Sequence, residues 1–97
     1  MYAVIFKAEI NKLDANYFDM ASRMRDLAIN QYGCKAFTSV TEGTQEIAIS
    51  YWEEQKQITQ WKQDADHLAA QALGQHTWYK AYTVQVVEIL REYSKSR

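Results

Sequence analysis

The sequence predicts an α+β fold in which helices cover one face of an antiparallel sheet. Three observations lead to this prediction. Four segments have the apolar alternation or composition of strands, apolar residues recur at helical spacing between them, and a short turn separates the two middle strands. The resulting order, β-α-β-β-α-β, is that of the ferredoxin-like fold. With 97 residues the chain fits one domain, 1–97, and we expect its polar end, 93–97, to be frayed.

The first strand is predicted over 2–10, because apolar residues alternate there and fill one face completely. Asp14 then has the position of an N-cap, where a carboxylate accepts hydrogen bonds from the first free amides of a helix. Apolar residues recur at helical spacing from Tyr17 to Ala28. Gly33 follows, and a glycine in the left-handed conformation is a common end of a helix.

The rest of the chain predicts a hairpin, a second helix in two pieces and a last strand. The hairpin strands, 36–41 and 45–52, are joined by a short turn over 42–44. The helical pieces are expected over 54–62 and 65–73, the second ending near Gly74. The last strand is expected over 78–90. It has Tyr82, Val84, Val86 and Leu90 on one face and Tyr79, Ala81, Thr83, Val87 and Ile89 on the other.

The sheet is expected to be apolar on both faces, since the first and last strands carry apolar residues on each side. Helices cover one face of this fold, so something else has to cover the second. A second copy of the sheet is the simplest cover, and the sequence therefore predicts a homodimer that pairs through the sheet face. The alternative is that the second face is a platform for a ligand.

Charge and cysteine content exclude several classes of function. The chain has 11 Lys and Arg against 12 Asp and Glu, so it lacks the basic field that nucleic acids require. No segment approaches the ~18 apolar residues of a membrane span. Cys34 is the single cysteine, which permits no intrachain disulfide and favours a reducing compartment, the cytoplasm. We interpret it as a small buried residue rather than a nucleophile.

Several short segments resemble the antibiotic biosynthesis monooxygenase (ABM) family of the dimeric α/β barrel superfamily. They are the step Gly33-Cys34, the run Ser50-Tyr51-Trp52-Glu53, the segment Ile58-Thr59-Gln60-Trp61, the segment Asp66-His67-Leu68-Ala69-Ala70, and Trp78-Tyr79 before the last strand. The resemblance implies two ferredoxin-like subunits paired as a dimeric barrel, with a cavity between sheet and helices in each subunit. Some members of this family oxidise polycyclic aromatic phenols or anthrones with O₂ and without metal or flavin. Others are haem-degrading enzymes, quinol oxygenases or processors of signalling molecules.

Trp61 and His67 are the candidate catalytic residues. Trp61 matches the Trp that recurs in the active cavities of the family. His67 shares a helix face with Gln71, four residues later, and Gly74 and Trp78 continue this stripe. An imidazole with a pKa of about 6.5 suits proton abstraction near neutral pH, and a deprotonated phenol or anthrone is electron-rich enough to react directly with O₂. The alternative is that His67 lies on a solvent-facing side of its helix.

An aromatic pocket is the predicted binding surface for a small hydrophobic or aromatic ligand. The residues expected to line it, around Trp61, are Tyr51, Trp52, Gln71, Trp78 and Tyr82. The alternative for the aromatic residues is that they belong to the core and the dimer interface.

The pattern favours an oxygenase without a bound cofactor. The sequence has no set of Cys, His and carboxylate residues at metal-ligand spacing and no glycine-rich phosphate loop. Haem-degrading members of the family have a His ten residues after the Trp and an Asn on the first strand. Here the first position is Gln71, and no Asn precedes Asn11. We therefore expect a cofactor-independent monooxygenase for a small aromatic or quinol-type substrate. The alternative is a non-catalytic small-molecule binding or signalling domain.

Overall fold

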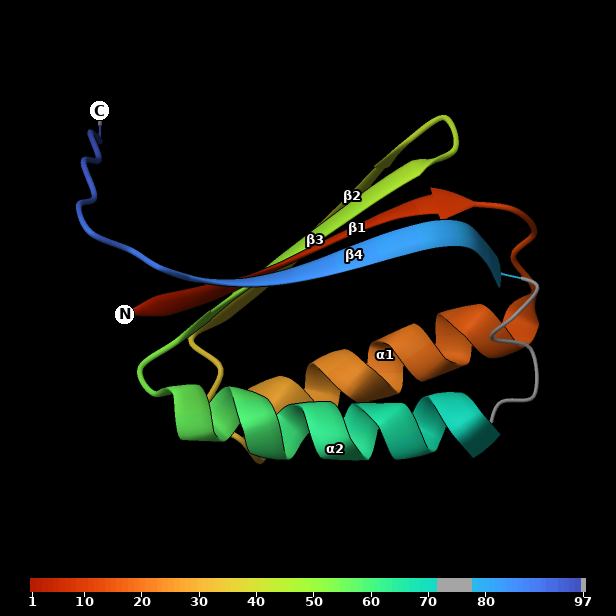
Figure 1. Cartoon of the computed structure of the whole chain (residues 1–97), viewed down its shortest axis with the longest axis horizontal. Coiled ribbons are helices and arrows are strands. Elements are labelled where there is room, and N and C mark those ends of the chain that lie inside the picture. The colour runs from red at the N-terminus through yellow and green to blue at the C-terminus, as the bar shows by residue number, and fades with distance from the viewer. Residues whose placement is uncertain (72–77, 97) are drawn as a thin grey trace.

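The computed structural model describes residues 1–71 and 78–96, and the side chains of these residues except for 67–71. Its elements are β1 (Tyr2–Ile10), α1 (Ala15–Asn30), β2 (Ala36–Glu42), β3 (Gln45–Trp52), α2 (Gln55–Gln71) and β4 (Tyr79–Glu88). Both helices lie on one side of the sheet (Figure 1). The predicted order, β-α-β-β-α-β, and the ferredoxin-like class are therefore confirmed.

The four strands form one antiparallel sheet in the order β2-β3-β1-β4. In the register Val4 lies opposite Ser50 on one side and Val86 on the other, and Phe6 lies opposite Val84. Val4 packs in a core cluster with residues of both helices. The strand side that carries Val4, Val84 and Val86 is therefore the helix-facing side, and the alternate residues form the outer face.

Helix α2 is continuous, so the prediction of two separate pieces is wrong. Between the two expected pieces the sequence has no glycine or proline, and a single Asp lowers helix propensity only slightly. Ile58, Trp61 and Ala65 follow one another at helical spacing, and all three are buried or half-buried. The packed face of the helix therefore runs through the expected break. The predicted end near Gly74 lies outside the described residues.

A β-bulge places Tyr79 on a different face from the one expected. Glu9 pairs with Ala81 and Ile10 pairs with Tyr79, which leaves Lys80 as an extra residue in β4. Tyr79 thus shares the helix-facing side with Tyr82 instead of lying opposite to it. Their ring centroids are 6.1 Å apart. The strand also starts one residue later and ends two residues earlier than the predicted range, 78–90.

The core consists of two clusters between the sheet and the helices. The first holds Val4, Ala28, Cys34, Trp52 and Ile58, and the second holds Tyr17, Met20 and Trp78. Cys34 is buried as predicted, and burial raises the pKa of its thiol. Its sulfur lies 3.2 Å from the carbonyl oxygen of Ala36, so the thiol serves as a small packed group that donates a weak hydrogen bond.

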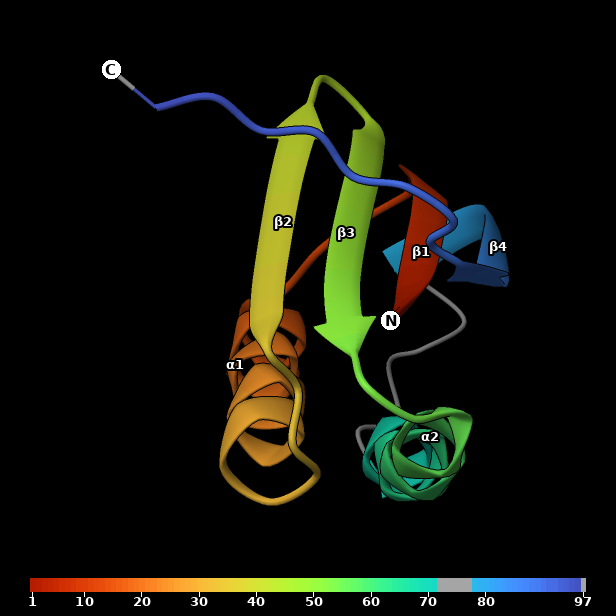
Figure 2. The same ribbon diagram turned by 90° about the vertical axis from the view of Figure 1, so that its left-hand side faces the viewer.

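The helices leave part of their own sheet face uncovered. In Figure 2 α1 lies beneath β2 and α2 lies beneath the other half of the sheet, and the main helix–sheet contacts are made to β2 and β3. On the helix-facing side of β4, the exposed fractions are 54% for Tyr82, 41% for Val84 and 49% for Val86. An apolar surface therefore remains open on the side that faces the helices.

The outer face of the sheet is apolar at its centre, as the sequence predicts. Ala3 is buried, and around it the half-buried apolar residues are Ile5, Ile47, Ile49, Tyr51 and Val87. Because Val84 and Val86 lie on the helix-facing side, neither belongs to this outer face. No helix in the described part of the chain is long and apolar enough to span a membrane.

Asp14 joins the start of α1 to the start of β4. It is the N-cap of α1, as predicted, and its Oδ1 accepts a hydrogen bond from the backbone amide of Tyr17 at 3.0 Å. The same oxygen accepts the indole N–H of Trp78 at 3.1 Å, and Trp78 is fully buried. One carboxylate therefore satisfies a helix end and a core indole.

We expect Asp14→Ala to lower the free energy of unfolding by about 2–4 kcal/mol, because it removes a cap and leaves a buried indole N–H unpaired. Asp14→Asn should restore most of this loss, since its amide oxygen can accept the same bonds. Urea unfolding followed by tryptophan fluorescence measures both. Equal stability of wild type and Asp14→Ala would contradict this account.

Candidate functional site

A row of four aromatic rings leads from the core to the open surface of β4. The row contains Tyr17 of α1, Phe6 of β1, and Tyr79 and Tyr82 of β4. Tyr17 lies 6.0 Å from Tyr79, Phe6 lies 5.5 Å from Tyr79 and 5.7 Å from Tyr82, measured between ring centroids. Tyr17 is buried, whereas Tyr82 is more than half exposed. We call these four residues the aromatic row.

A buried carboxylate lies beneath the aromatic row. Glu46 of β3 is only 5% exposed, and each of its oxygens has a phenol partner. The hydroxyl of Tyr17 donates to Oε1, and the hydroxyl of Tyr79 donates to Oε2 at 3.0 Å. The register places Glu46 opposite Ala8 on one side and Thr41 on the other. Two strands and one helix therefore contribute the three residues Glu46, Tyr79 and Tyr17, which we call the Glu46 cluster.

Burial dominates the electrostatics of the Glu46 cluster. It raises the pKa of Glu46 above the ordinary value of a glutamate, although the hydrogen bond from Tyr79 acts in the opposite direction. Burial also raises the pKa of Tyr79, and the neighbouring Glu46 raises it further. The phenol of Tyr79 thus keeps its proton and acts as the donor in this pair. The ion pairs of the described residues, Lys35–Glu53 and Lys62–Asp66, lie elsewhere on the surface.

Sequence reasoning did not select Glu46, Tyr17 or Tyr79 as site residues. A signal was present: Glu46 falls on the same strand face as Ser50 and Trp52, so the alternation of β3 puts an acid on the core side. Such a residue needs partners, because an unpaired buried carboxylate is costly. The partners come from α1 and from the bulge in β4, and neither can be derived from local spacing.

Trp61 and Trp52 are brought together, but within the core. Their ring centroids are 5.4 Å apart, and Trp61 also contacts Phe37. The indole of Trp61 donates to the backbone carbonyl of Met24 at 3.0 Å, and that of fully buried Trp52 donates to Ser50 Oγ at 2.8 Å. The contacts of both residues are those of packing and of joining α2 to α1.

The structure separates the other residues that the sequence placed in one pocket. Tyr51 pairs with Ala3 and lies on the outer face, opposite to Trp52. Trp78 is fully buried beside Tyr17, and Tyr82 is exposed at the end of the aromatic row. His67 and Gln71 lie in the last part of α2, and their side chains are outside the described part.

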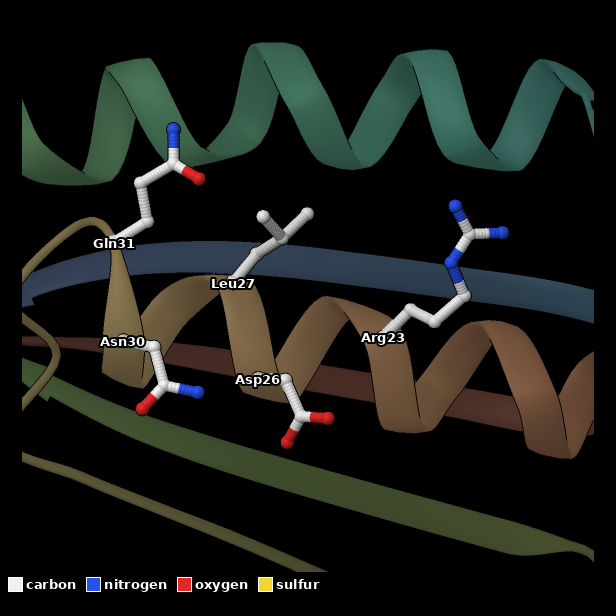
Figure 3. A pocket seen from close by; sticks show the side chains of 5 residues that line it. All are labelled: Arg23, Asp26, Leu27, Asn30 and Gln31. Atoms are coloured by element: carbon white, nitrogen blue, oxygen red, sulfur yellow. The ribbon is translucent and has the colours of Figure 1, made fainter.

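Two surface hollows in the described part of the chain lie mostly away from the aromatic row, and Tyr82 is the one member of the row that lines either of them. One, of about 470 Å³, lies on α1, where Arg23, Leu27 and Gln31 point toward α2 and Asp26 and Asn30 point away from it (Figure 3). The other, of about 380 Å³, lies at the hairpin end of the sheet. Its lining residues are Lys7, Ala8, Glu9, Gln45, Glu46, Ile47, Ala81, Tyr82 and Thr83. Most of these belong to the outer face, so the hollow opens away from the helices.

Among residues 1–66 and 78–96, no group of three or more His, Cys, Asp or Glu side chains is arranged to hold a metal ion. What the described side chains offer instead is an apolar aromatic surface with a phenol–carboxylate pair at one end. Such a surface can bind a flat ring and exchange hydrogen bonds with a polar group on it.

The fold is shared with solved oxygenase structures, although no protein-family model and no curated protein sequence matches the chain. SnoaB of Streptomyces nogalater, a cofactor-independent oxygenase, is 10% identical with a TM-score of 0.75, and the match covers 97% of each chain. Rv0793 of Mycobacterium tuberculosis is 12% identical with a TM-score of 0.74, over 97% of this chain and 100% of the other. An antibiotic biosynthesis monooxygenase is 15% identical with a TM-score of 0.69, over 94% and 100%. The chain therefore has the ABM-type fold.

Glu46→Gln should change how stability depends on pH. Between the ordinary glutamate pKa, about 4.5, and the raised value, folded wild-type protein holds a proton that the unfolded chain has released. Ionisation of Glu46 therefore lowers the free energy of unfolding of the wild type as pH rises through this window. The variant cannot titrate there, so its stability relative to the wild type should improve from pH 4 to pH 7. Urea unfolding of both proteins measures the difference, and a constant difference would contradict the burial argument.

Proposed function

We propose that the protein is a cofactor-independent monooxygenase of the ABM type, which oxidises a small aromatic or quinol-type substrate with O₂. The observation that carries this proposal is the aromatic row, which ends on an open apolar surface facing the helices and has a buried carboxylate beside it. The shared fold with SnoaB, a cofactor-independent oxygenase, supports the proposal.

The substrate ring is proposed to lie between α2 and the helix-facing side of β1 and β4. Phe6, Tyr82 and Val84 offer it aromatic and aliphatic contacts there, and burial of a flat ring on such a surface is favourable. Gln71 shares a helix face with His67 and is proposed to contact the same ligand from α2. Tyr51, which lies on the outer face, is assigned to the subunit interface instead.

The proposed reaction requires the protein only to bind the substrate, to orient it and to remove a proton from it. His67 is proposed as the general base. Once deprotonated, an anthrone or phenol supplies electrons to O₂ directly. With an anthrone, one oxygen atom becomes a new carbonyl and the other leaves as water with two hydrogens of the ring. Trp61 is proposed to act through position, because its hydrogen bond to Met24 holds the helix that carries His67.

The working unit is proposed to be a homodimer in the cytoplasm. The outer face of the sheet is apolar at its centre, and a second copy of that face would cover it. The single cysteine, Cys34, is buried and needs no oxidising compartment.

Oxygen uptake by the metal-free protein, measured with anthrones, hydroquinones and catechols, tests the proposed reaction. We expect substrate-dependent uptake that falls by about 10²–10⁴-fold in His67→Ala, because the base is lost. Trp61→Phe should lose at least about 10-fold, because it displaces α2. Thr59→Ala, which removes an exposed hydroxyl bonded within α2 to the carbonyl of Gln55, is the control and should keep its activity. Uptake no faster than the spontaneous rate would contradict the oxygenase and favour a ligand-binding module.

Ile49→Lys tests the proposed dimer. Ile49 is half-buried at the centre of the outer face, and a lysine there would place two charges in the interface. We expect light scattering to show a dimeric mass for the wild type and a monomeric mass for the variant. Val86→Lys, on the helix-facing side of β4, is the matched control and should stay dimeric. A dimeric mass for Ile49→Lys would rule out pairing through this face.

A further inference from the structure

We propose that the Glu46 cluster selects hydroxylated rings: Tyr79 accepts a hydrogen bond from a hydroxyl group of the substrate, and Glu46 is the positioning residue that makes Tyr79 an acceptor. This inference rests on the proposed function, since it concerns the same binding surface. It adds the residues that would recognise the substrate, and it narrows the small aromatic substrates to rings that bear at least one free hydroxyl.

Exposure indicates which member of the cluster can meet a ligand. Glu46 is 5% exposed and Tyr17 is 8% exposed, so both are closed off from the open surface. Tyr79 is half-buried, and its ring lies against Phe6 and Tyr82, the members of the aromatic row that reach this surface. A ligand ring on Phe6 and Tyr82 therefore meets the cluster at Tyr79.

The direction of the hydrogen bonds fixes what Tyr79 can offer. A phenol has one proton to donate, and Tyr79 donates it to Glu46 Oε2 at 3.0 Å. The oxygen of Tyr79 is then left with acceptor capacity only. The second oxygen of Glu46 is occupied by the hydroxyl of Tyr17, so the carboxylate has a fixed orientation. Around it Ala8 and Thr41 bring no charge.

This arrangement distinguishes groups that donate a hydrogen bond from groups that accept one. A phenol or quinol hydroxyl can donate to Tyr79, whereas an ether or a quinone carbonyl can only accept and finds no proton there. A polar site discriminates most strongly against a ligand that leaves its buried groups unpaired. The reduced, hydroxylated form of a ring is thus favoured over its alkylated or fully oxidised form.

Tyr79 and Glu46 together can also take up the proton of the substrate hydroxyl that Tyr79 binds. The substrate O–H bond breaks as its proton moves to the oxygen of Tyr79, and the proton of Tyr79 moves to Glu46. The result is a substrate anion and a neutral carboxylic acid, with the total charge unchanged. Burial favours the neutral form of Glu46, so it assists this transfer. The site would then have a proton acceptor on the sheet in addition to the one proposed on α2.

Binding of 1-naphthol and of 1-methoxynaphthalene, measured as dissociation constants by NMR titration, tests the selectivity without turnover. The wild type should prefer the naphthol by about 5- to 10-fold, the worth of one hydrogen bond. In Tyr79→Phe the ratio of the two constants should shift by about 5- to 10-fold toward the ether relative to the wild type. Comparison of ratios between variants cancels the intrinsic difference in hydrophobicity of the two probes.

A second variant tests the role of Glu46 and keeps the proposal testable if Tyr79→Phe folds poorly. Glu46→Leu, made together with Tyr17→Phe so that no buried phenol is left unpaired, frees the proton of Tyr79. The preference should then shift toward the ether, which accepts that proton. A merely structural role of Glu46 would weaken both ligands equally. The control, Tyr32→Phe, removes another carboxylate-bound phenol and should keep the wild-type ratio.

The outcomes separate this inference from the proposed function. A hydroxyl preference that depends on Tyr79, without oxygen uptake for any substrate, would support the inference and contradict the oxygenase. Oxygen uptake with equal ratios in the wild type and Tyr79→Phe would overturn the inference and leave the oxygenase in place. Absence of saturable binding for either probe would also overturn it.

Discussion

The site depends on incomplete cover of a four-stranded sheet by two helices. Both helices pack on one side, and they make their main contacts with β2 and β3. The first core cluster and its half-buried neighbours Phe37 and Trp61 fill the space under that half. Under β4 the sheet side chains stay exposed instead. The same constraint therefore produces both a stable core and an apolar surface beside it.

Hydrogen bonding decides which polar groups this thin core can hold. In the described part of the chain, no buried side-chain nitrogen or oxygen lacks a partner. Asp14 accepts two N–H groups, and Glu46 accepts two phenols. Asp14 directly precedes α1 and Glu46 is the second residue of β3, and the starts of α1, β3 and β4 lie at the same end of the molecule (Figure 1). Hydrogen-bonded carboxylates therefore stabilise this end of the sheet, including the aromatic row, together with apolar packing.

The sequence predicted the strands and the first helix well, because their signals are local. Alternation in 2–10, the N-cap Asp14 and the turn after Glu42 each fix an element without reference to the rest of the fold. The face of Tyr79 could not be predicted this way, since an extra residue in β4 reverses the alternation and only pairing with β1 reveals it. The continuous α2 was missed because a polar stretch, 62–64, looks like a break although Ala65 keeps the packed face.

The candidate site was predicted by residue type rather than by contact, and this explains what was found and what was missed. Large aromatic residues are obvious candidates in a sequence, yet Trp52 and Trp78 are fully buried and belong to the two core clusters. Glu46 was not selected, because a single acidic residue in a strand is common and its burial becomes evident only when the sheet face on which it lies is known. Solved structures that are 10–15% identical to this chain share its layout of sheet and helices, but this likeness does not show which side chains form a site. The chemistry of this chain is therefore better argued from the partners of Glu46 than from the tryptophans that the sequence placed in an aromatic pocket.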